Sequence, residues 1–270
     1  MSAASTGRSA STPAAFFDLD RTLISGSSAF TLAIQARRAG LIPTLEFAQD
    51  AAGAVAFKFL GASDDTSEQV RERILSAVSG MRRADLLALN AEVVPRLIER
   101  VRPEAMRLLD RHRDAGRDTY IVSAAPIELV EPLAHALGMT GGIGTRSALV
   151  DGVYTGDLDG PFVYGAGKVE AMRSLAASNG YDLAGSYAYS DSVSDLPMLE
   201  AVGHPVAVNP DSRLERHARV NAWPIVIFSQ RTKWVVRRTL GGVATVGVGV
   251  GGFALGARFG RRRAPRLVPW

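Results

Sequence analysis

The chain has 270 residues, 47% of them hydrophobic, which is enough to bury one large core or one core with an inserted domain. It contains no cysteine, and this excludes disulfides, thiolate metal sites and cysteine nucleophiles. The formal net charge is only +4, and the four histidines are scattered, without the paired spacing of a metal site.

The N-terminal residues 1–13 are small and polar, rich in serine, threonine and alanine. They lack the apolar stretch of a signal peptide, so we expect a disordered segment at the start of a cytoplasmic protein. The apolar run 14–17 follows, and it is typical of a buried parallel strand. We therefore expect the folded core to begin at residue 14.

Two carboxylates, Asp18 and Asp20, stand where this first strand ends. An unpaired buried carboxylate is unfavourable, so two of them at the end of a core strand require a cation or a reaction. In open α/β sheets, sites of this kind lie at the carboxyl ends of the strands. The same pattern could also be an ordinary junction with solvated aspartates, and the rest of the chain has to decide between the two.

The segment 29–97 has the pattern of helices, with breaks at 40–43, at 61–65 and at Gly80. The serines of 25–28 could cap the first of these helices near Ala29. No part of the segment has the pattern of a strand. A helical block directly after the first strand predicts an inserted cap over 29–97, with a core built from 14–28 and 98–228.

Strands and helices alternate after Pro103. The strands are expected at 119–123, 142–149, 153–155, 186–190, 205–208 and 224–228, with a turn at 151–152. The helices are expected at 104–115, 128–137, 168–178 and 197–202. This alternation predicts an α/β fold, a doubly wound parallel sheet of the Rossmann type with helices on both faces.

Polar side chains follow the later strands where each of them ends. Ser123 ends one strand, Asp191 follows another, and Asp195 comes four residues after it. Lys168 opens a helix after a loop with two glycines. Each residue taken alone could be structural, but the ordered set is hard to produce by chance. We expect these side chains to meet the first two aspartates at one edge of the sheet.

This set of side chains suits phosphoryl transfer. A phosphate monoester resists attack because its oxygens are negatively charged, so a site must neutralise that charge and align the nucleophile. Carboxylate oxygens are hard ligands that favour Mg²⁺ over zinc. A lysine and a serine hydroxyl can hold phosphate oxygens, and an aspartate can be the nucleophile that becomes an aspartyl phosphate.

Two other kinds of site fit less well. Gly165-x-Gly167-Lys168 is similar to the end of a P-loop, but the first glycine of that motif is absent and Val169 replaces its Ser or Thr. No G-x-S-x-G motif surrounds Ser123, and no histidine follows at a plausible strand end, so a serine hydrolase is poorly supported.

Four motifs occur in a fixed order along the chain: Asp18-Leu-Asp20-Arg-Thr22, Ser123, Lys168, and Asp191 with Asp195. Together they resemble the four motifs of the haloacid dehalogenase superfamily. The helical insert after the first motif, and the phrases YSDSVSDLPML and VAVNPD, are similar to its subclass IB hydrolases, which include phosphoserine phosphatases. The resemblance covers residues 14–228 and implies the fold with an inserted helical cap.

The resemblance also implies the catalytic and metal-binding roles. Asp18 would be the nucleophile and a Mg²⁺ ligand. Asp20 would be the general acid/base, with its backbone carbonyl on the metal, and Asp191 would be a further ligand. The implied activity is a Mg²⁺-dependent phosphomonoesterase that forms an aspartyl phosphate.

The remaining matches concern the phosphoryl group. Ser123 and Lys168 would bind its oxygens, and Asp195 would support the metal site. The implied partner is a small phosphorylated metabolite. Two rivals stay open, namely a phosphotransferase or mutase on the same scaffold and a non-catalytic, membrane-bound regulatory protein.

The residues expected to contact the substrate differ in type from those of phosphoserine phosphatases. Those enzymes resemble one another in a glutamate where this chain has Ser27. Ala124 and Ala125 replace the two glycines of their second motif, and Ser190 and Ser192 replace the two glycines that flank the aspartate of their fourth motif, here Asp191. We therefore expect L-phosphoserine to be a poor substrate. Four arginines of the cap region are candidates to contact an anionic substrate, although a solvated helix face would explain most of them: Arg71, Arg73, Arg82 and Arg83.

The composition changes after Phe228, in the tail 229–270. Residues 240–257 carry no charge but include seven glycines, and cations flank them over 231–266. The tail could be a flexible linker, yet the flanking cations favour contact with an anionic membrane surface, so we expect peripheral or tail-anchored attachment to the inner face of the cell membrane. No nucleic-acid partner is expected, because the basic residues lack interleaved aromatics.

Overall fold

The computed structural model describes residues 11–41 and 67–228 of the protein. The chain divides into two compact units, 1–228 and 229–270, so every described residue belongs to the first unit. The predictions for the tail, for residues 1–10 and for the middle of the cap lie outside the described residues. Within the described ranges, no helix is both long and apolar enough to cross a bilayer.

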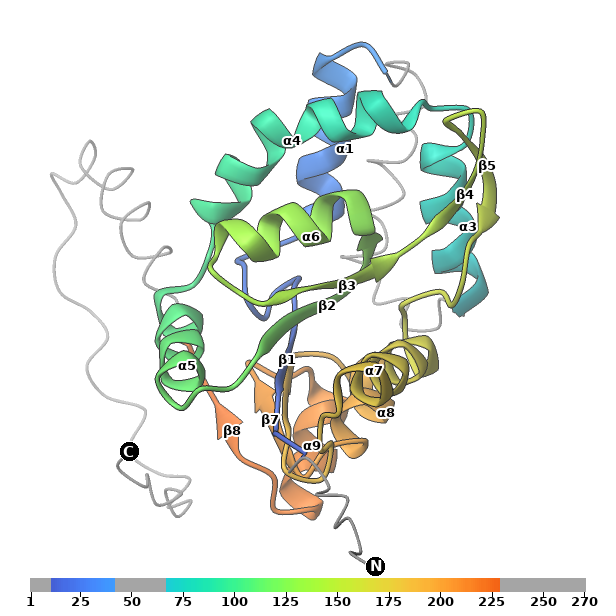
Figure 1. The fold of residues 1–270 in the computed structure, drawn as a ribbon. Helices are drawn as coiled ribbons and strands as arrows, with labels where there is room; N and C mark the ends of the chain where they lie inside the picture. The colour runs from blue at the N-terminus through green and yellow to red at the C-terminus, as the bar shows by residue number, and fades with distance from the viewer. Residues whose placement is uncertain (1–10, 42–66, 229–270) are drawn as a thin grey trace, which may run out of the picture. The chain divides into compact units, whose positions relative to one another are not determined.

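Six parallel strands form the central sheet, in the order β3-β2-β1-β6-β7-β8 (Figure 1). Their bounds are β1 (Ala15–Asp18), β2 (Thr119–Pro126), β3 (Gly141–Thr145), β6 (Tyr187–Ser190), β7 (His204–Val208) and β8 (Ile225–Val226). The chain builds the sheet outward from β1 on one side and then returns to build the other side, starting with β6. This confirms the predicted doubly wound α/β fold. The change of direction places a crevice at the carboxyl ends of β1 and β6.

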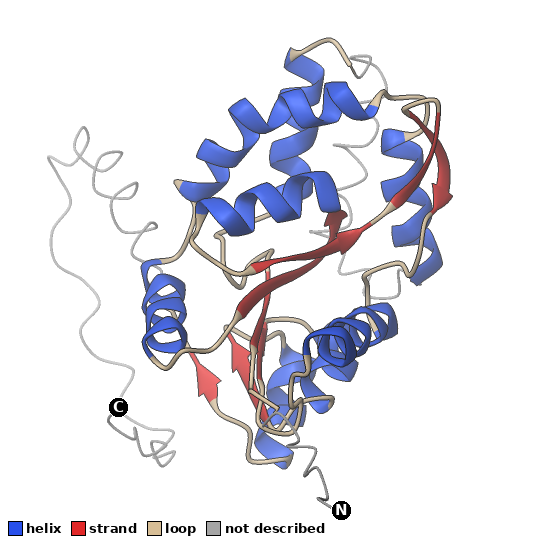
Figure 2. Ribbon diagram, in the orientation of Figure 1, coloured by secondary structure: helices blue, strands red, loops and turns tan. Residues whose placement is uncertain are grey.

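Helices cover both faces of this sheet (Figure 2). Phe17 of β1 belongs to a core with Leu109 and Leu129, which lie on α5 and α6. Its neighbour Phe16 belongs to a second core with Met172 on α7, and α8 and α9 complete that core. Burial on both faces explains why the strands are continuous apolar runs. These helices are α5 (Pro103–Asp114), α6 (Ile127–Ala136), α7 (Ala166–Asn179), α8 (Leu196–Glu200) and α9 (Ser212–Val220).

Three further helices, α1 (Ser28–Arg38), α3 (Ser67–Val78) and α4 (Arg83–Ile98), belong to the segment predicted as a cap. Helix α4 packs against α1 and α6. Its buried apolar side chains recur at helical spacing: Leu86, Leu89, Val93 and Leu97. The described part of this segment is therefore helical, as expected. The boundary between cap and core at residues 28–29 and 97–98 stays a prediction.

The chain enters and leaves this helical segment side by side. The Ser25 amide donates to the Arg100 carbonyl at 2.8 Å, and the Arg102 amide donates to the Leu23 carbonyl at 2.9 Å. The Arg100 guanidinium donates back to the Ser25 carbonyl, also at 2.9 Å. Gly26 has a φ of +109°, and a Cβ there would meet Arg100 Nη2 at 2.2 Å, so the crossing requires glycine.

The predicted strand 142–149 is wrong at its end, because the structure divides it at Arg146. The second part, β4 (Ser147–Val150), leaves the central sheet and pairs antiparallel with β5 (Val153–Leu158). Asp151 and Gly152 join them with φ angles of 50° and 77°, the conformation of a two-residue type I′ turn. An apolar pattern alone could not separate these two pairings.

The β4–β5 hairpin contacts the helices of the cap segment. The Tyr154 amide donates to the Met81 carbonyl at 3.0 Å, and the Gly80 amide donates to the Tyr154 carbonyl at 2.9 Å. Residues 147–158 therefore pair with the junction between α3 and α4, although the sequence places them in the core.

Candidate active site

A cavity of about 930 Å³ opens at the carboxyl ends of β1, β2 and β6. All six side chains predicted to form the site line this cavity: Asp18, Asp20, Ser123, Lys168, Asp191 and Asp195. The structure thus brings together residues that lie up to 177 positions apart in the chain. Their common placement at this edge of the sheet agrees with the prediction.

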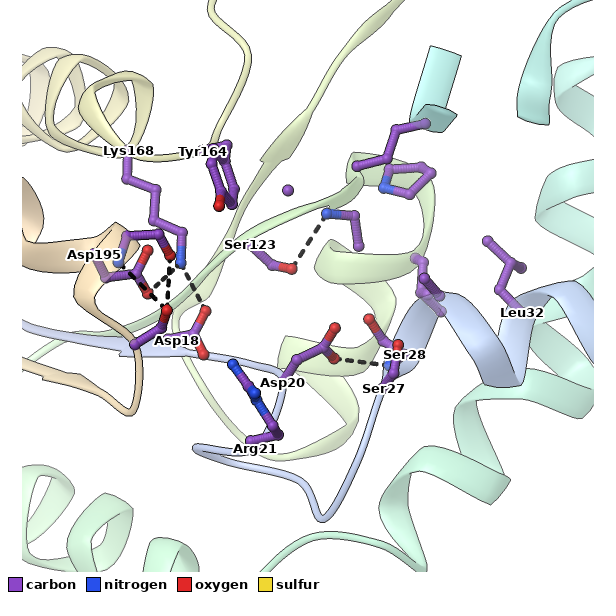
Figure 3. Close-up of a pocket in the computed structure, with 18 of the residues that line it drawn as sticks. Asp18, Asp20, Arg21, Ser27, Ser28, Leu32, Ser123, Tyr164, Lys168 and Asp195 are labelled. Carbon is purple, nitrogen blue, oxygen red and sulfur yellow. Dashed lines mark hydrogen bonds and ion pairs between the residues drawn. The ribbon is translucent and has the colours of Figure 1, made fainter. Parts of the chain in front are cut away.

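Lys168 lies between two carboxylates (Figure 3). Its Nζ donates to Asp18 Oδ1 at 2.6 Å and to Asp195 Oδ2 at 2.7 Å, and all three side chains are nearly or wholly buried. Although burial alone would lower it, the two carboxylates raise the pKa of the Lys168 ammonium. Lys168 is therefore charged and fixed in place at neutral pH.

Two glycines allow Lys168 to reach this position. Gly165 precedes α7 with a φ of 53°, which is a conformation that suits glycine. A Cβ on Gly167 would meet the Phe162 carbonyl oxygen at 1.8 Å. Gly165 therefore supplies the turn and Gly167 the close approach to Phe162, and the first turn of α7 then directs Lys168 into the cavity.

Ser190 supports the site from behind the cavity, a role that the sequence did not predict. It is fully buried at the end of β6, and its hydroxyl donates to Asp195 Oδ2 at 2.7 Å. Asp195 thus has two donors, a hydroxyl and an ammonium, which fix its orientation. A serine in place of a glycine beside the aspartate was the available signal, but a sequence pattern does not show which group it contacts.

Asp20 lies apart from the lysine, at the amino end of α1. Its Oδ1 accepts the Ser28 amide at 2.7 Å, and Ser27 caps the helix by accepting the Phe30 amide at 3.3 Å. Burial raises the pKa of Asp20, and the Ser28 amide opposes this. The predicted serine cap is correct, and the helix begins one residue earlier than expected.

Asp191 forms an ion pair with Arg21, which the sequence did not predict. Arg21 Nε lies 2.9 Å from Asp191 Oδ2, with the arginine side chain 62% exposed and the aspartate 7%. Burial raises the pKa of Asp191 to about 7, and Arg21 opposes this rise. Arg21 has a φ of 64°, so a sharp turn after Asp20 turns it toward the cavity.

Asp211 supports the loop that carries Asp191. Its amide donates to the Asp191 carbonyl at 2.8 Å, and its Oδ2 accepts the Val193 amide at 2.8 Å. Its Oδ1 caps α9 by accepting the Leu214 amide at 2.8 Å. The aspartate of the VAVNPD phrase is thus both a helix cap and a brace for the site.

Ser123 lines the cavity but does not end its strand. The predicted strand 119–123 continues to Pro126, with a register shift against β3 between Val122 and Pro126. Ser123 is 5% exposed, and its Oγ accepts the Ala125 amide at 3.2 Å. The irregular pairing explains why the strand is longer than its apolar run.

The donor set fits a hard divalent cation. Among the described residues, no group of three or more His, Cys, Asp or Glu side chains is close enough to hold a metal. The predicted Mg²⁺ site requires only two carboxylates, those of Asp18 and Asp191, and the Asp20 carbonyl oxygen. Burial raises the pKa of both carboxylates, and a bound cation would offset that penalty.

The predicted cap arginines do not line this cavity. Arg82 pairs with Asp85 at 2.7 Å, and Arg83 pairs with Glu128 at 3.1 Å. Arg71 lies in a separate groove beside β5, and the Arg73 side chain lies outside the described residues. Arg71 also pairs with Glu68 on its own helix, so each of the three described arginines has a nearby carboxylate partner. This favours the alternative that these side chains lie on solvated helix faces, and contact with an anionic substrate stays a prediction.

Residues 15–200 match the sequence model of the haloacid dehalogenase-like hydrolase family. A probable phosphatase of Mycobacterium tuberculosis is 38% identical over 249 residues, which cover 90% of this chain and 86% of that protein. Phosphoserine phosphatase SerB1 of the same organism is 37% identical over 258 residues, covering 94% and 82%. A solved structure of a Bordetella pertussis protein of unknown function is 30% identical, with a TM-score of 0.71 over 80% of this chain and 98% of that one.

Proposed function

Since the chain belongs to the haloacid dehalogenase-like hydrolase family and is a phosphatase, we propose that it hydrolyses phosphate monoesters through an aspartyl phosphate on Asp18, with Mg²⁺ as cofactor. One observation carries this proposal. The Asp18 carboxylate lies at the end of β1, inside the cavity, with Oδ1 held 2.6 Å from the Lys168 ammonium. A carboxylate oriented by a fixed cation is suited to attack on a phosphoryl group.

In the first step, an Asp18 oxygen attacks phosphorus and the bond to the ester oxygen breaks. The departing alkoxide needs a proton, and Asp20 would donate it. Burial raises the pKa of Asp20, which favours the protonated carboxyl that this step requires. The products of the step are the free alcohol and an aspartyl phosphate on Asp18.

In the second step, water attacks the aspartyl phosphate and the bond between phosphorus and the Asp18 oxygen breaks. Asp20, now ionised, accepts the proton of that water. The step releases inorganic phosphate and restores both carboxyl groups. Asp20 suits both roles because it is held by the Ser28 amide on α1, apart from the Lys168 ion pairs.

Two groups are available for the phosphoryl oxygens, the Lys168 ammonium and the Ser123 hydroxyl. Asp18, Asp191 and the Asp20 carbonyl would hold Mg²⁺, which supplies positive charge to the phosphate when bound. Arg21, whose side chain is 62% exposed, can leave Asp191 without unfolding anything around it.

The test is phosphate release by the purified protein, with Asp18→Asn, Asp20→Asn and EDTA as perturbations. Asp18→Asn and EDTA should abolish turnover. Asp20→Asn should slow turnover by about 10²–10⁴-fold and accumulate a phosphate adduct on the peptide that contains Asp18, detected by mass spectrometry after an acid quench.

Asp159→Asn is a matched control, because Asp159 is an exposed loop residue that does not line the cavity. It should hydrolyse substrate at the wild-type rate. Full activity of Asp18→Asn, or an adduct that maps to another peptide, would refute the mechanism.

A further inference from the structure

The cavity has two chemically different parts. All of its charged lining residues come from the end of β1 and the turn after it, from the loop and short 3-10 helix after β6, or from the amino ends of α7 and α9. Among the described residues of α1, α3 and α4 and their junction, none that lines the cavity is charged. The apolar part is lined chiefly by Leu32, Ile74, Val78, Met81, Leu86 and Leu89.

Helix α1 leaves room along this apolar part. Ala29, Ala33 and Ala36 line the cavity and lie on one face of the helix, at spacings of four and three residues. Leu32 lines it beside them, on the side away from Lys168, beyond Ser27 and Ser28 (Figure 3). Small side chains on a cavity-facing surface leave space that larger side chains would fill.

The volume of this space exceeds what a phosphate ester of a small polar alcohol requires. At about 930 Å³, the cavity lies near the upper end of the range for small-molecule sites, roughly 300–1,000 Å³. By the proposed mechanism the phosphoryl group lies at the charged end, next to Asp18 and Lys168. The alcohol of the ester must then extend toward the apolar part.

A charged alcohol would be poorly accommodated there. An ammonium or carboxylate loses hydration on entering the cavity, and the described apolar lining offers no ionic partner to replace it. A hydrocarbon chain would instead bind favourably there, because each methylene removed from water contributes about 0.8 kcal/mol to the binding free energy. The lining therefore selects against amino-acid phosphates and in favour of apolar esters.

We propose that the substrate is a phosphate monoester of a long-chain apolar alcohol, with its hydrocarbon chain lying between α1, α3 and α4. This inference rests on the proposed function, since it places the phosphoryl group at Asp18. Leu32, Leu86 and Leu89 determine specificity by contacting the chain.

The test is kcat/KM for ethyl, butyl, hexyl and octyl phosphate, below their aggregation concentrations, with L-phosphoserine as comparator. We expect a rise of about fourfold for each methylene that enters the cavity, which is the fold-change equivalent of 0.8 kcal/mol. L-Phosphoserine should be a poorer substrate than butyl phosphate.

A flat or falling series, or L-phosphoserine as the best substrate, would overturn the inference. The proposed function would still stand in that case, provided that Asp18→Asn abolishes hydrolysis of ethyl phosphate or L-phosphoserine. If none of these esters is hydrolysed in the presence of Mg²⁺, both proposals fail.

Ala33→Phe provides a second test, because it fills part of the apolar space from the half-buried face of α1. The ratio of kcat/KM for octyl over ethyl phosphate should fall at least about tenfold, the loss of roughly two buried methylenes. Measuring both substrates on one preparation cancels any change in the folded fraction. Ala88→Phe, on the exposed face of α4, should keep the wild-type ratio, and an unchanged ratio in Ala33→Phe would contradict the placement of the chain.

Discussion

Acid should destabilise the protein through His112, a residue of α5 that is 3% exposed. Its Nδ1 lies 2.9 Å from Arg117 Nε, and its Nε2 lies 2.8 Å from the Tyr189 hydroxyl. An arginine can only donate, so Nδ1 must accept and the ring proton lies on Nε2, which donates to Tyr189. Protonation of Nδ1 would place its N–H opposite the Nε–H of Arg117, so that two donors face each other without an acceptor.

The size of the effect follows from the pKa of His112. Burial, and secondarily Arg117, lower it from 6.5 to about 4. Between these two values the unfolded chain binds a proton that the folded chain does not. The contribution of His112 to stability is therefore complete above pH 6.5 and is lost as the pH falls toward 4. Between pH 7.5 and pH 4.5, the loss should be about 2.5 kcal/mol.

The assay compares urea unfolding of the wild type and His112→Gln at both pH values. The comparison is needed because burial raises the pKa of Asp18 and Asp191, and their contributions change with pH in the opposite direction. Glutamine can still donate to Tyr189 but does not titrate. The variant should be less stable at pH 7.5, and the gap should close by about 2.5 kcal/mol at pH 4.5. If the difference in unfolding free energy between wild type and variant stays constant within about 0.5 kcal/mol, or grows in acid, then His112 does not have the assigned tautomer and lowered pKa.

Three further outcomes are expected. Ser190→Ala removes the hydroxyl that donates to Asp195, and it should lower the free energy of unfolding by about 1.5–3 kcal/mol in urea titrations. The control Ser178→Ala, on the exposed side of α7, should change that free energy by less than about 0.5 kcal/mol. Equal changes in the two variants would contradict the role of Ser190. Lys168→Met leaves two buried carboxylates unpaired, so it should abolish phosphate release and lower stability by about 3–5 kcal/mol, and a fully active, equally stable variant would disprove the ion pairs. The tail should bind vesicles of anionic lipid at low salt, so the full chain should sediment with them and a chain ending at Phe228 should not; if neither sediments, the membrane prediction fails.

The central sheet and the edge that carries the site could be predicted from the sequence. Strands buried on both faces are apolar throughout, as the run through Phe16 and Phe17 is, and parallel strands present their carboxyl ends at one edge. Asp18 ends one such strand and Asp191 directly follows another, and Lys168 follows two glycines, of which one supplies a positive φ and the other a close approach to Phe162. At these positions the local sequence pattern and the strand order of the sheet both place the polar side chain at the same edge.

The other features depend on contacts that no local pattern encodes. Arg146 divides an apolar run whose two halves pair with different partners, and only the turn at Asp151 and Gly152 indicates the second pairing. The ion pair of Arg21 with Asp191 joins residues 170 positions apart. The apolar lining of the cavity mixes residues of three helices, and each of those side chains has the pattern of an ordinary core residue.

The side-by-side crossing at Ser25 and Arg100 has a consequence for how this protein can diversify. The two ends of the helical segment are joined by the 2.8 Å hydrogen bond from the Ser25 amide to the Arg100 carbonyl. The geometry of the sheet therefore does not depend on how many residues lie between them. Insertions, deletions or wholesale replacement between these residues would leave the distance from Asp18 to Lys168 unchanged. Selection can thus alter the proposed choice of alcohol through the part of the segment beyond Ser28, whose amide holds Asp20, while the phosphoryl chemistry is inherited intact. Grafting the segment of a relative between Ser28 and Arg100, with Ser28 kept, would exchange selectivity between the two proteins.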